Sequence, residues 1–573
     1  MRKCLHIHLA QRMTEVKEIE GEAQLSRGRH YIAKTLLAGG IATVDPLSPE
    51  NLLIFSAGPF AGTNFSNANR ISVGCKSPLT GGIKEANSGG TFAVALGHIE
   101  VAGLTLHGAS ADWVVIRIAR DGTVSFDTAE PYLGLGCDES AKLLFERYGA
   151  KVSIALCGPV GEYLGLMAGI SFTDTDGRPS RLAARGGVGA VMGSKKVKAI
   201  VVDMHKMPSF PDRKKLMGEI REYGDRIAKD PVAAGFRRLG TAAMGDVMNL
   251  IGALPVNNFS GGQQVNPAKG TFKLGGDFVR EVNEGRGGEH AHACMPGCQI
   301  ECSNVYVDQA GKEIVSPLEY ESLGLMGSNL GLTHPDQVAQ LNAIANDLGV
   351  DSIEAGAVLG ILLEDGQAAF GDMEFLRDAL EDIRRGSDRG RLLAQGAARV
   401  GAHYKVRRVP TIKGQAISAY DPRVIEVTGI SMMLSAQGAD HTAGAAATYD
   451  CNGKTTAELV AVSLEAQVAA ATADSLGLCI FGRAVTGVSG DLIANALNAA
   501  CGTDIQQTFL QALGREALVM EWKFNKAAGF SAADNTLPDF FYTEALPPTG
   551  KNARHSSAEV SRCLQEQLAV DVF

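Results

Sequence analysis

Residues 181–202 read RLAARGGVGAVMGSKKVKAIVV, and they close a long segment in which short β-type runs alternate with glycines. Such runs, bounded by turn residues, are typical of strands: LLIFSAG (52–58), RISVG (70–74), DWVVIRIA (112–119), TVSFD (123–127), KVSIALCG (151–158) and KAIVVDM (198–204). The glycines between them permit positive φ or a close approach of the backbone to a ligand. We therefore predict a β-rich N-terminal domain over residues 1–207.

After this segment the spacing of the apolar residues becomes helical. KMPSFPDRKK (206–215) is typical of a linker, and PDQVAQLNAIANDLG (335–349) has the apolar period of a helix. EFLRDALEDIRRG (374–386) has the same period and ends in two arginines and a glycine, a helix stop signal. Further helices are expected at 456–473 and near DLIANALNAA (491–500). The pattern predicts an α+β protein in which two mainly helical domains, 208–410 and 411–573, follow the β-rich one.

The composition is that of a chain able to bury large apolar cores. Its 573 residues are enough for about three or four domains. Apolar residues make up 45% and charged residues 20%, which is ordinary for a globular protein. The formal net charge is −9 and no basic run is present, which argues against nucleic acid as a partner.

The location in the cell is predicted from the N-terminus, from one apolar stretch and from the cysteines. The first 22 residues, MRKCLHIHLAQRMTEVKEIEGE, contain no apolar core of a secretory signal. The most apolar stretch, 457–482, carries Glu458, Glu465 and Asp474, which favour a buried helix over a membrane span. Most of the eleven cysteines stand alone, as expected in a reducing compartment. We expect a cytoplasmic protein without a membrane span.

One short pattern occurs twice, each time at the end of an apolar helical stretch. NDLGVD spans residues 346–351 and DSLGLC spans residues 474–479. The simplest interpretation is a pair of ordinary glycine helix ends. The alternative is that the two motifs hold two similar ligands, or the two halves of one ligand.

The stretch CMPGCQIEC (294–302) places Cys294, Cys298 and Cys302 four residues apart. Structural zinc sites usually combine two ligand pairs, and no second pair follows here. Three close cysteines with one more distant in sequence are a common way to hold a [4Fe–4S] cluster. An iron–sulfur cluster is therefore the favoured prediction and zinc the alternative. Spacing alone leaves Cys451, Cys479 and Cys501 open as the fourth ligand.

Several stretches, taken together and in order, resemble the tungsten-dependent aldehyde:ferredoxin oxidoreductase family along most of the chain. They are VDPLSPENLLIFSAGPFAGT, NRISVGCKSPLTGGIKEANSGG, RLAARGGVGAVMGSKKVKAI, the cysteine cluster, LEYESLGLMGSNLG, NDLGVDSIEAG, YDPR, GADHT and DSLGLC. No single one of them is specific, but their combination is.

The resemblance implies a tungsten bis-molybdopterin (tungsten or molybdenum) and a [4Fe–4S] cluster held by Cys294, Cys298, Cys302 and Cys479. It also implies that each of the two repeated motifs binds one pterin, the cofactor-binding residues being Asn346, Asp351, Asp474 and Leu478. Asp474 matches the acidic position that accepts hydrogen bonds from a pterin amine, a task that suits a carboxylate. At the first motif the matching residue is Asn346, whose carbonyl oxygen accepts less strongly.

The N-terminal segment would form the pterin-cradling β-domain of the family. There, Arg70 and Arg181 match arginines near the pterins and their phosphates, and guanidinium groups suit such anionic oxygens. Asn87 and Leu182 match the positions whose backbone carbonyls hold a Mg²⁺ between the two phosphates.

Three further residues match the substrate pocket of the family. Glu321 corresponds to its active-site glutamate, with Glu319 as an alternative two residues away. His441 in GADHTAG corresponds to its active-site histidine, and Tyr420, which opens YDPR, to a pocket tyrosine of some members. Glu321 would act as general base, and His441 would stabilise charge that develops on the substrate oxygen.

The expected function is oxidation of an aldehyde to a carboxylic acid, with electrons leaving through the cluster to ferredoxin or a small iron–sulfur subunit. Two departures from the family pattern, the C-x3-C spacing of Cys294 and Cys298 and the residue Asn346, indicate a divergent member. One alternative is a low-potential reductase subunit acting on an aromatic acyl-CoA or a carboxylic acid. An alternative from another class is a non-enzymatic electron-transfer or zinc-stabilised scaffold protein. The oligomeric state stays open.

Overall fold

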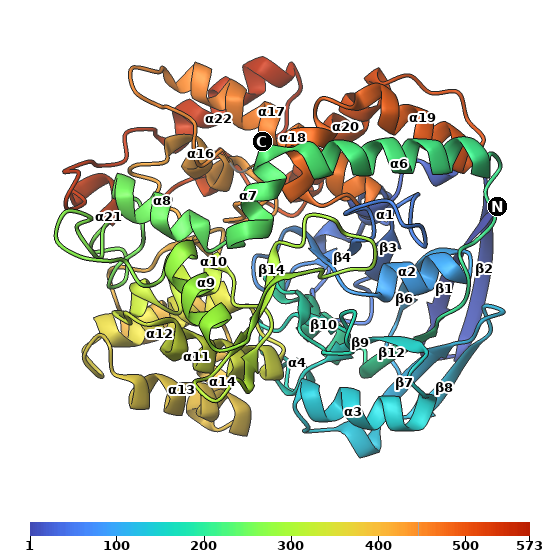
Figure 1. The fold of residues 1–573 in the computed structure, drawn as a ribbon, viewed down its shortest axis with the longest axis horizontal. Coiled ribbons are helices and arrows are strands. Elements are labelled where there is room, and N and C mark those ends of the chain that lie inside the picture. Colours follow the sequence, from blue (N-terminus) through green and yellow to red (C-terminus); the bar gives the residue numbers. More distant parts are fainter. Residues whose placement is uncertain (445) are drawn as a thin grey trace.

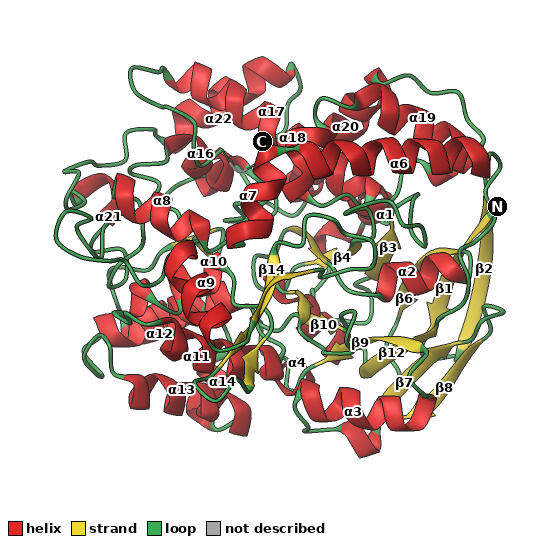
Figure 2. Cartoon of the chain, in the orientation of Figure 1, coloured by secondary structure: helices red, strands yellow, loops and turns green. Residues whose placement is uncertain are grey.

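The computed structural model describes residues 1–444 and 446–573 of the chain. Nearly all long strands lie in the first 203 residues, and the remainder is mainly helical (Figures 1 and 2). The predicted α+β class, with a β-rich part followed by helical parts, is therefore confirmed.

The first of two six-stranded sheets has the strand order β5-β4-β3-β6-β1-β2. β1 and β6 are parallel, and every other neighbouring pair is antiparallel. Its strands are β1 (Arg2–His8), β2 (Met13–Ile19), β3 (Leu53–Ala57), β4 (Ile71–Lys76), β5 (Ile83–Ser88) and β6 (Val101–His107).

The second sheet repeats this arrangement, with the order β11-β10-β9-β12-β7-β8 and a single parallel pair, β7 and β12. Its strands are β7 (Val114–Ile118), β8 (Val124–Thr128), β9 (Val152–Cys157), β10 (Ile170–Phe172), β11 (Arg181–Ala183) and β12 (Val197–Asp203). Helices α2 (Phe92–His98) and α5 (Val188–Ser194) occupy the same place in each half, before the last strand. The N-terminal part is thus an internal duplication, which the sequence analysis did not predict.

The two sheets share one apolar core. Phe55 of β3 lies 6.4 Å from Phe172 of β10 between ring centroids, and Phe92 of α2 lies within 6.0 Å of both. β3, β4 and β9 are buried along their whole length, and β3 and β9 accordingly contain a single polar residue each, a serine, without a regular alternation.

Helices make up most of the chain after β12. The helices of the N-terminal part are α1 (Gly28–Ala38), α3 (Cys137–Tyr148) and α4 (Pro159–Glu162), besides α2 and α5. The middle part contains α6 (Arg213–Lys229), α7 (Pro231–Leu239), α8 (Ala243–Ile251), α9 (Gly276–Gly285), α10 (Tyr320–Leu325), α11 (Pro335–Leu348), α12 (Ser352–Glu364), α13 (Met373–Arg385), α14 (Asp388–Leu393) and α15 (Ala397–Tyr404). The last part contains α16 (Glu426–Leu434), α17 (Thr456–Leu476), α18 (Arg483–Thr486), α19 (Gly490–Cys501), α20 (Thr508–Ala527), α21 (Asp539–Thr543) and α22 (Ser557–Leu568).

Two small sheets lie among these helices. One contains β13 (Glu289–His292), β14 (Ser303–Val307) and β15 (Glu313–Val315), and the other contains β16 (Thr411–Ile412) and β17 (Gln415–Ala416). The cysteine stretch 294–302 is the connection between β13 and β14.

The helices expected from apolar periodicity are confirmed. α13 ends at Gly386, whose φ of 60° is the left-handed conformation expected of a helix stop. α17 covers the predicted helix 456–473 and continues for three residues to Leu476.

α17 is long and apolar enough to cross a membrane, but most of it is buried within the described part of the chain. It packs against α1, α16, α20 and α22. This packing agrees with the predicted buried helix.

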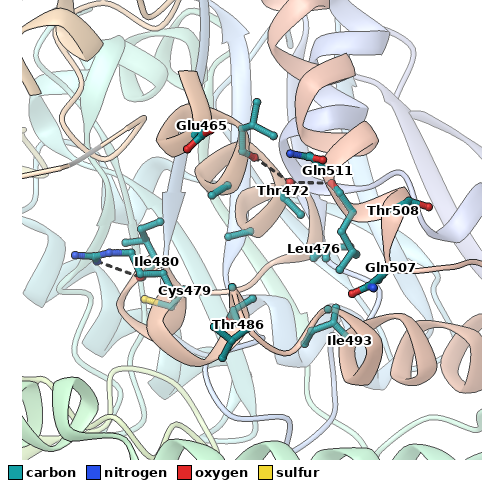
Figure 3. A pocket seen from close by; sticks show the side chains of 18 residues that line it. Glu465, Thr472, Leu476, Cys479, Ile480, Thr486, Ile493, Gln507, Thr508 and Gln511 are labelled. Carbon is teal, nitrogen blue, oxygen red and sulfur yellow. Dashed lines mark hydrogen bonds between the residues drawn. The ribbon is translucent and has the colours of Figure 1, made fainter. Parts of the chain in front are cut away.

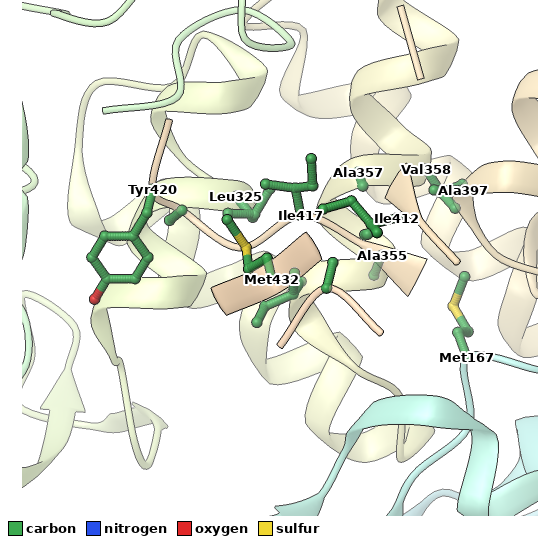
Figure 4. Packing of buried hydrophobic residues seen from close by; sticks show 14 of the residues in the cluster. Met167, Leu325, Ala355, Ala357, Val358, Ala397, Ile412, Ile417, Tyr420 and Met432 are labelled. Atoms are coloured by element: carbon green, nitrogen blue, oxygen red, sulfur yellow. The ribbon is translucent and has the colours of Figure 1, made fainter. Parts of the chain in front are cut away.

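The domain boundaries at 207/208 and 410/411 stay predictions, because one large core joins all three segments. Figure 4 shows Met167, Leu325 and Met432, one from each segment, in this core. Tyr420 lies at its edge, with the hydroxyl end pointing away from the aliphatic side chains.

Candidate active site

One cavity brings together most of the residues predicted for the site. It encloses about 910 Å³ of empty space, open solvent at its mouth included. The predicted residues among its walls are Arg70, Asn87, Leu182, Glu321, Asp351, His441, Asp474 and Cys479. Tyr420, Arg181, Asn346, Leu478 and the other three cluster cysteines do not line it.

The two repeated motifs end helices that meet this cavity from different directions. α11 ends at Gly349 (φ 68°), and α17 ends at Gly477 (φ 71°). After the first turn, Asp351 caps α12 by accepting from the amide of Ile353 at 3.0 Å. The interpretation as glycine helix ends is thus correct, and both helix ends also reach the cavity.

In each half of the duplicated N-terminal part, one glycine lets the backbone closely approach one of the two repeated motifs. A Cβ on Gly58, directly after β3, would lie 2.1 Å from the carbonyl oxygen of Leu476. A Cβ on Gly158, directly after β9, would lie 2.3 Å from the carbonyl oxygen of Leu348. Only glycine permits this approach, so the duplication positions one helix end per half.

The backbone bonds repeat the same symmetry. The amide of Arg70, before β4, donates to the carbonyl of Gly477 at 3.0 Å, and the amide of Gly169, before β10, donates to that of Gly349 at 2.9 Å. The edge strands β5 and β11, which carry Asn87 and Leu182, contact each other. The two halves therefore meet beside the cavity.

Asp474 lies in a buried network of charges. Its carboxylate accepts from Arg29 at 3.2 Å and from the side-chain amide of Asn87 at 3.1 Å. Burial raises its pKa to about 6, against the opposing effect of Arg29 and Arg70. Asp474 is therefore held in place by Arg29 and Asn87, and its pKa stays above the ordinary value of an aspartate.

The other two residues predicted from the repeated motifs lie differently. Asn346 is half-buried on α11, and its side-chain nitrogen is buried without a hydrogen-bond partner. The side chain of Leu478 is fully buried in the core beside the cluster cysteines and contributes no polar group.

Glu321 and His441 form the titratable pair of the cavity. Oε1 of Glu321 lies 3.2 Å from Nε2 of His441, and Oε2 accepts from the amide of Ala419 at 2.9 Å. Burial raises the pKa of Glu321, and His441 lowers it in part. Nδ1 of His441 has no hydrogen-bond partner among the described residues, so both side chains retain polar atoms for a ligand.

Tyr420 packs beside this pair. Its ring centroid lies 5.4 Å from that of His441 and 5.3 Å from that of Tyr320. Burial raises its pKa well above the usual value, so the phenol stays protonated. It can limit the space around His441 and donate a hydrogen bond.

Glu319 and Glu321 face different surroundings. Glu319 accepts from the hydroxyl of Thr241, and its charge raises the pKa of Cys302. Glu321 faces the cavity, so of the two glutamates it has the position of a base.

The four cysteines predicted to hold a cluster lie together. Burial raises the pKa of Cys302, and Cys294, Cys479 and Cys298 raise it further. A Cβ on Gly89 would lie 2.9 Å from Sγ of Cys294, and the amide of Gly90 donates to the carbonyl of Cys294 at 2.9 Å. The glycine pair after β5 therefore supports the cysteine stretch.

The spacing of the sulfurs distinguishes between metal centres. Within the described part of the chain, no three of these sulfurs lie within 4.8 Å of one another. A single zinc bound at about 2.3 Å would bring four sulfurs to within about 3.8 Å of each other. The spacing therefore does not fit one zinc ion as arranged, whereas four thiols are the donor set that a [4Fe–4S] cluster would need.

The alternative fourth ligands lie elsewhere. Cys451 is half-buried beside Glu426, and Cys501 is buried near Arg2. Cys479, in contrast, is among the main groups that raise the pKa of each of the three clustered cysteines.

Arg70 lies between the cluster cysteines and the cavity. Its guanidinium donates to Asn87 at 2.5 and 3.0 Å and lies 3.9 Å from Sγ of Cys479. Arg181 instead donates to Ser303 at 2.7 Å and lies 3.7 Å from Asp174. Arg181 is thus oriented toward the end of the cysteine stretch.

Sequence reasoning missed several charged residues of the cavity. Arg185 donates to Asp351 at 3.1 Å, and Lys84 donates to Asp440 at 2.8 Å. Glu85 has its pKa raised to about 8, first by burial and then by Asp474. Only their positions could have identified them in the sequence. Lys84 and Glu85 lie on β5 shortly before the pair Gly89-Gly90, and Arg185 directly precedes the pair Gly186-Gly187.

A larger cavity lies on the opposite face of the end of α17 and is bounded by α19 and α20. Figure 3 shows Thr472, Leu476 and Ile493 among its mostly apolar walls. It shares Cys479 and Ile480 with the first cavity but contains neither Glu321 nor His441.

A group of possible cation ligands, Asp174, Asp176 and His292, lies near the cysteine stretch. Arg178 donates to both aspartates, at 3.3 and 2.6 Å. This arginine already neutralises much of their charge, so the group is an ion-pair network.

Comparison with known proteins places the chain in a family. Residues 4–204 match the N-terminal domain of aldehyde ferredoxin oxidoreductase, and residues 219–569 match its domains 2 and 3. The tungsten-containing aldehyde ferredoxin oxidoreductase of Pyrococcus furiosus is 33% identical over 90% of this chain and 86% of its own length. That of Pyrococcus horikoshii is 32% identical over 89% and 86%.

One solved structure resembles the whole fold. The active-site complex of a benzoyl coenzyme A reductase with 1,5-dienoyl-CoA matches with a TM-score of 0.82, covering 100% of this chain and 95% of the matched chain at 18% identity. The two domain matches and the identities above show that this chain belongs to the aldehyde ferredoxin oxidoreductase family, a family of oxidoreductases.

Proposed function

We propose that the protein oxidises an aldehyde to a carboxylic acid at a tungsten (or molybdenum) bis-pterin centre and passes the electrons through a [4Fe–4S] cluster to ferredoxin or an iron–sulfur subunit. The observation that carries the proposal is the shared cavity, whose walls include Glu321, His441, both repeated motifs and Cys479. Family membership, with relatives named as tungsten-containing aldehyde ferredoxin oxidoreductases, supports it.

The residues of the cavity would divide the work of holding the cofactor. The turns ending at Asp351 and Asp474 would each hold one pterin, with Arg70 near the pterins. The backbone carbonyls of Asn87 and Leu182, on the two touching edge strands, would hold Mg²⁺. When bound, the metal would supply Lewis acidity and two-electron redox chemistry, which belong to the cofactor.

Glu321 would act as the general base. Its raised pKa brings the carboxylate nearer to the working pH, where a base takes a proton from water most efficiently. His441, 3.2 Å away, would donate a hydrogen bond to the substrate oxygen, and Tyr420 would restrict the position of the substrate beside it.

Cys479 would connect the two parts of the electron path. It follows the second repeated motif and belongs to the four-cysteine group, and Arg70 reaches both Cys479 and Asn87. The described residues, 1–444 and 446–573, include one such group of four, so the proposal requires an external electron acceptor.

Low-potential reduction of an aromatic acyl-CoA is the second candidate. Its support is the fold likeness to the benzoyl coenzyme A reductase complex over the entire chain. The higher identity to aldehyde oxidoreductases favours the first candidate.

Metal analysis and activity decide between the candidates. Protein purified without oxygen should contain about one tungsten or molybdenum and about four iron per chain, and should oxidise aldehydes with benzyl viologen. Zinc without pterin would instead support the scaffold alternative. Activity with an acyl-CoA alone would overturn the aldehyde assignment.

A further inference from the structure

We propose that the surface directly outside the cysteine stretch is the docking site for a small acidic iron–sulfur protein. This surface, called here the cluster face, is a hollow of about 690 Å³ of empty space, bordered by Ala228, Ala234, Arg237, Arg238, His290 and Gln299. The inference rests on the proposed function in assuming that electrons leave through the four-cysteine group.

The cluster face lies where the cysteine stretch reaches the surface. Cys298 and Cys302 are buried, but Gly297, directly before Cys298, and Gln299, directly after it, are exposed. The side chain of Gln299 packs on Gly224 of α6, where a Cβ would lie 2.9 Å from its amide nitrogen. A centre held by these cysteines is therefore separated from solvent by little more than its own loop at this face.

The helices around the hollow also pack against the segment that carries Cys479. Phe236 of α7 packs against Phe481, two residues after Cys479, with ring centroids 4.9 Å apart. Tyr223 of α6 is buried in the same apolar cluster as Cys298 and Cys302. α6 and α7, which cross the front of the C-terminal helices in Figure 1, thus form a rigid cover beside the four cysteines.

The charge of the hollow differs from that of the whole chain. The formal net charge is −9, so an acidic protein is repelled by most of the surface. The described residues that line the hollow include two arginines and a histidine and no carboxylate. The carboxylates that pair with Arg237, Arg238 and His290 lie outside its walls: Glu301 at 2.7 Å, Asp277 at 3.4 Å and Glu284 at 2.7 Å. An acidic carrier can therefore exchange these surface pairs for its own carboxylates.

The apolar component suits a brief encounter. The small side chains of Ala228 and Ala234 border the hollow and offer apolar surface to a partner. Redox complexes use small interfaces, below about 1,200 Å², with arginine enriched. A small face of this composition favours fast exchange over tight binding.

The test measures direct binding of an acidic ferredoxin with two [4Fe–4S] clusters to the loaded enzyme at low ionic strength. Arg237→Glu/Arg238→Glu should weaken binding at least about tenfold and flatten its dependence on salt. Oxidation of aldehyde with benzyl viologen should be unchanged, because the dye needs no docking site. Ala234→Asp is a second variant that should weaken binding without removing an arginine, because Ala234 is exposed and borders the hollow.

The matched control is Arg407→Glu/Arg562→Glu. Both arginines are as exposed as Arg237 and Arg238, and each makes one surface ion pair, with Glu544 and Glu566. Equal weakening by control and test variants, no effect of the test variants, or no binding to the parent enzyme would each overturn the docking site. Because binding is measured without turnover, a parent enzyme that binds the ferredoxin but oxidises no aldehyde would contradict the proposed function alone.

Discussion

Nε2 of His441 lies 3.2 Å from Oε1 of Glu321, although the two residues belong to different parts of the chain. His441 follows α16, and Glu321 lies in the first turn of α10. The amide of Ala419, next to Tyr420, fixes the other carboxylate oxygen at 2.9 Å. The pair is therefore oriented by two segments that converge only in the folded protein, which is the arrangement expected of a positioned base.

Glu321→Gln should lower the rate of aldehyde oxidation by about 10²–10⁴-fold, because the amide cannot accept a proton. Metal and pterin contents should stay at the level of the parent enzyme. The control is Glu319→Gln, which lies beside Cys302 and should change the spectrum of the iron–sulfur centre with a smaller effect on rate. A larger loss of rate in Glu319→Gln would assign the base to Glu319.

The pH dependence should reflect the buried carboxylate. Burial raises the pKa of Glu321 above its ordinary value of 4.5, and the base works only when deprotonated. As the pH falls through this raised pKa, kcat/KM should decrease, on the acid limb of the profile. His441 lowers the pKa in part, so His441→Gln should move the limb to higher pH. If the acid limb of His441→Gln stayed at the same pH as in the parent enzyme, Glu321 would not be the group whose protonation causes it.

The helical parts of the fold could be predicted well, because amphipathic spacing and stop signals are local. α13 begins and ends within one residue of the stretch expected from EFLRDALEDIRRG. The duplication of the N-terminal part could not be predicted in this way. Its halves share little beyond Gly58-Pro59 and Gly158-Pro159, and pairing between strands depends on contacts distant in sequence.

The site was predictable where a residue has its own chemical signal. Cys479 and His441 stand in glycine-marked motifs, and both line the cavity. Arg29 has no such signal: it lies in an ordinary helix, and its role arises only because Glu521 and Asp474 approach it from α20 and α17. The direction of Arg181 was not predictable either, because its partner Ser303 belongs to a separate small sheet.

Cys479→Ala should remove the iron–sulfur centre, measured as loss of iron and of its visible absorbance. The reason is that Cys479 is among the main groups that raise the pKa of the three clustered thiols, whereas Cys451 lies beside Glu426 and Cys501 near Arg2. Cys451→Ala and Cys501→Ala are therefore the matched controls and should retain iron. Retention of iron in Cys479→Ala together with its loss in a control would identify another fourth ligand.

Substitution of Gly58 and substitution of Gly158 should affect the cofactors differently. In Gly58→Ala the new Cβ meets the backbone of Leu476, so the end of α17 must move with Asp474 and Cys479, and both pterin and iron should be lost. In Gly158→Ala the new Cβ meets the backbone of Leu348, which displaces only the turn before α12. This variant should lose pterin and retain iron.

The control for the glycine pair is Gly218→Ala, since a Cβ there meets no atom within 4 Å. It lies inside α6, where alanine is favoured over glycine by about 1 kcal/mol, so stability should be equal or slightly higher. If Gly58→Ala retained normal iron and pterin, the close approach of the N-terminal half to the second motif would have no role in holding the cofactors.

Arg29→Met should be strongly destabilising, because it leaves two buried carboxylates without their partner. Arg29 is 2% exposed and donates to Glu521 at 2.7 and 2.9 Å and to Asp474 at 3.2 Å. Loss of one partner from a buried charge network costs about 3–5 kcal/mol of unfolding free energy, measured by denaturant titration of the loaded enzyme. Arg226→Ala, which breaks an exposed pair with Glu222, should cost less than about 1 kcal/mol. Arg29→Met/Glu521→Gln should recover part of the loss, and a double variant as unstable as the sum of both single ones would show that Arg29 and Glu521 do not stabilise each other.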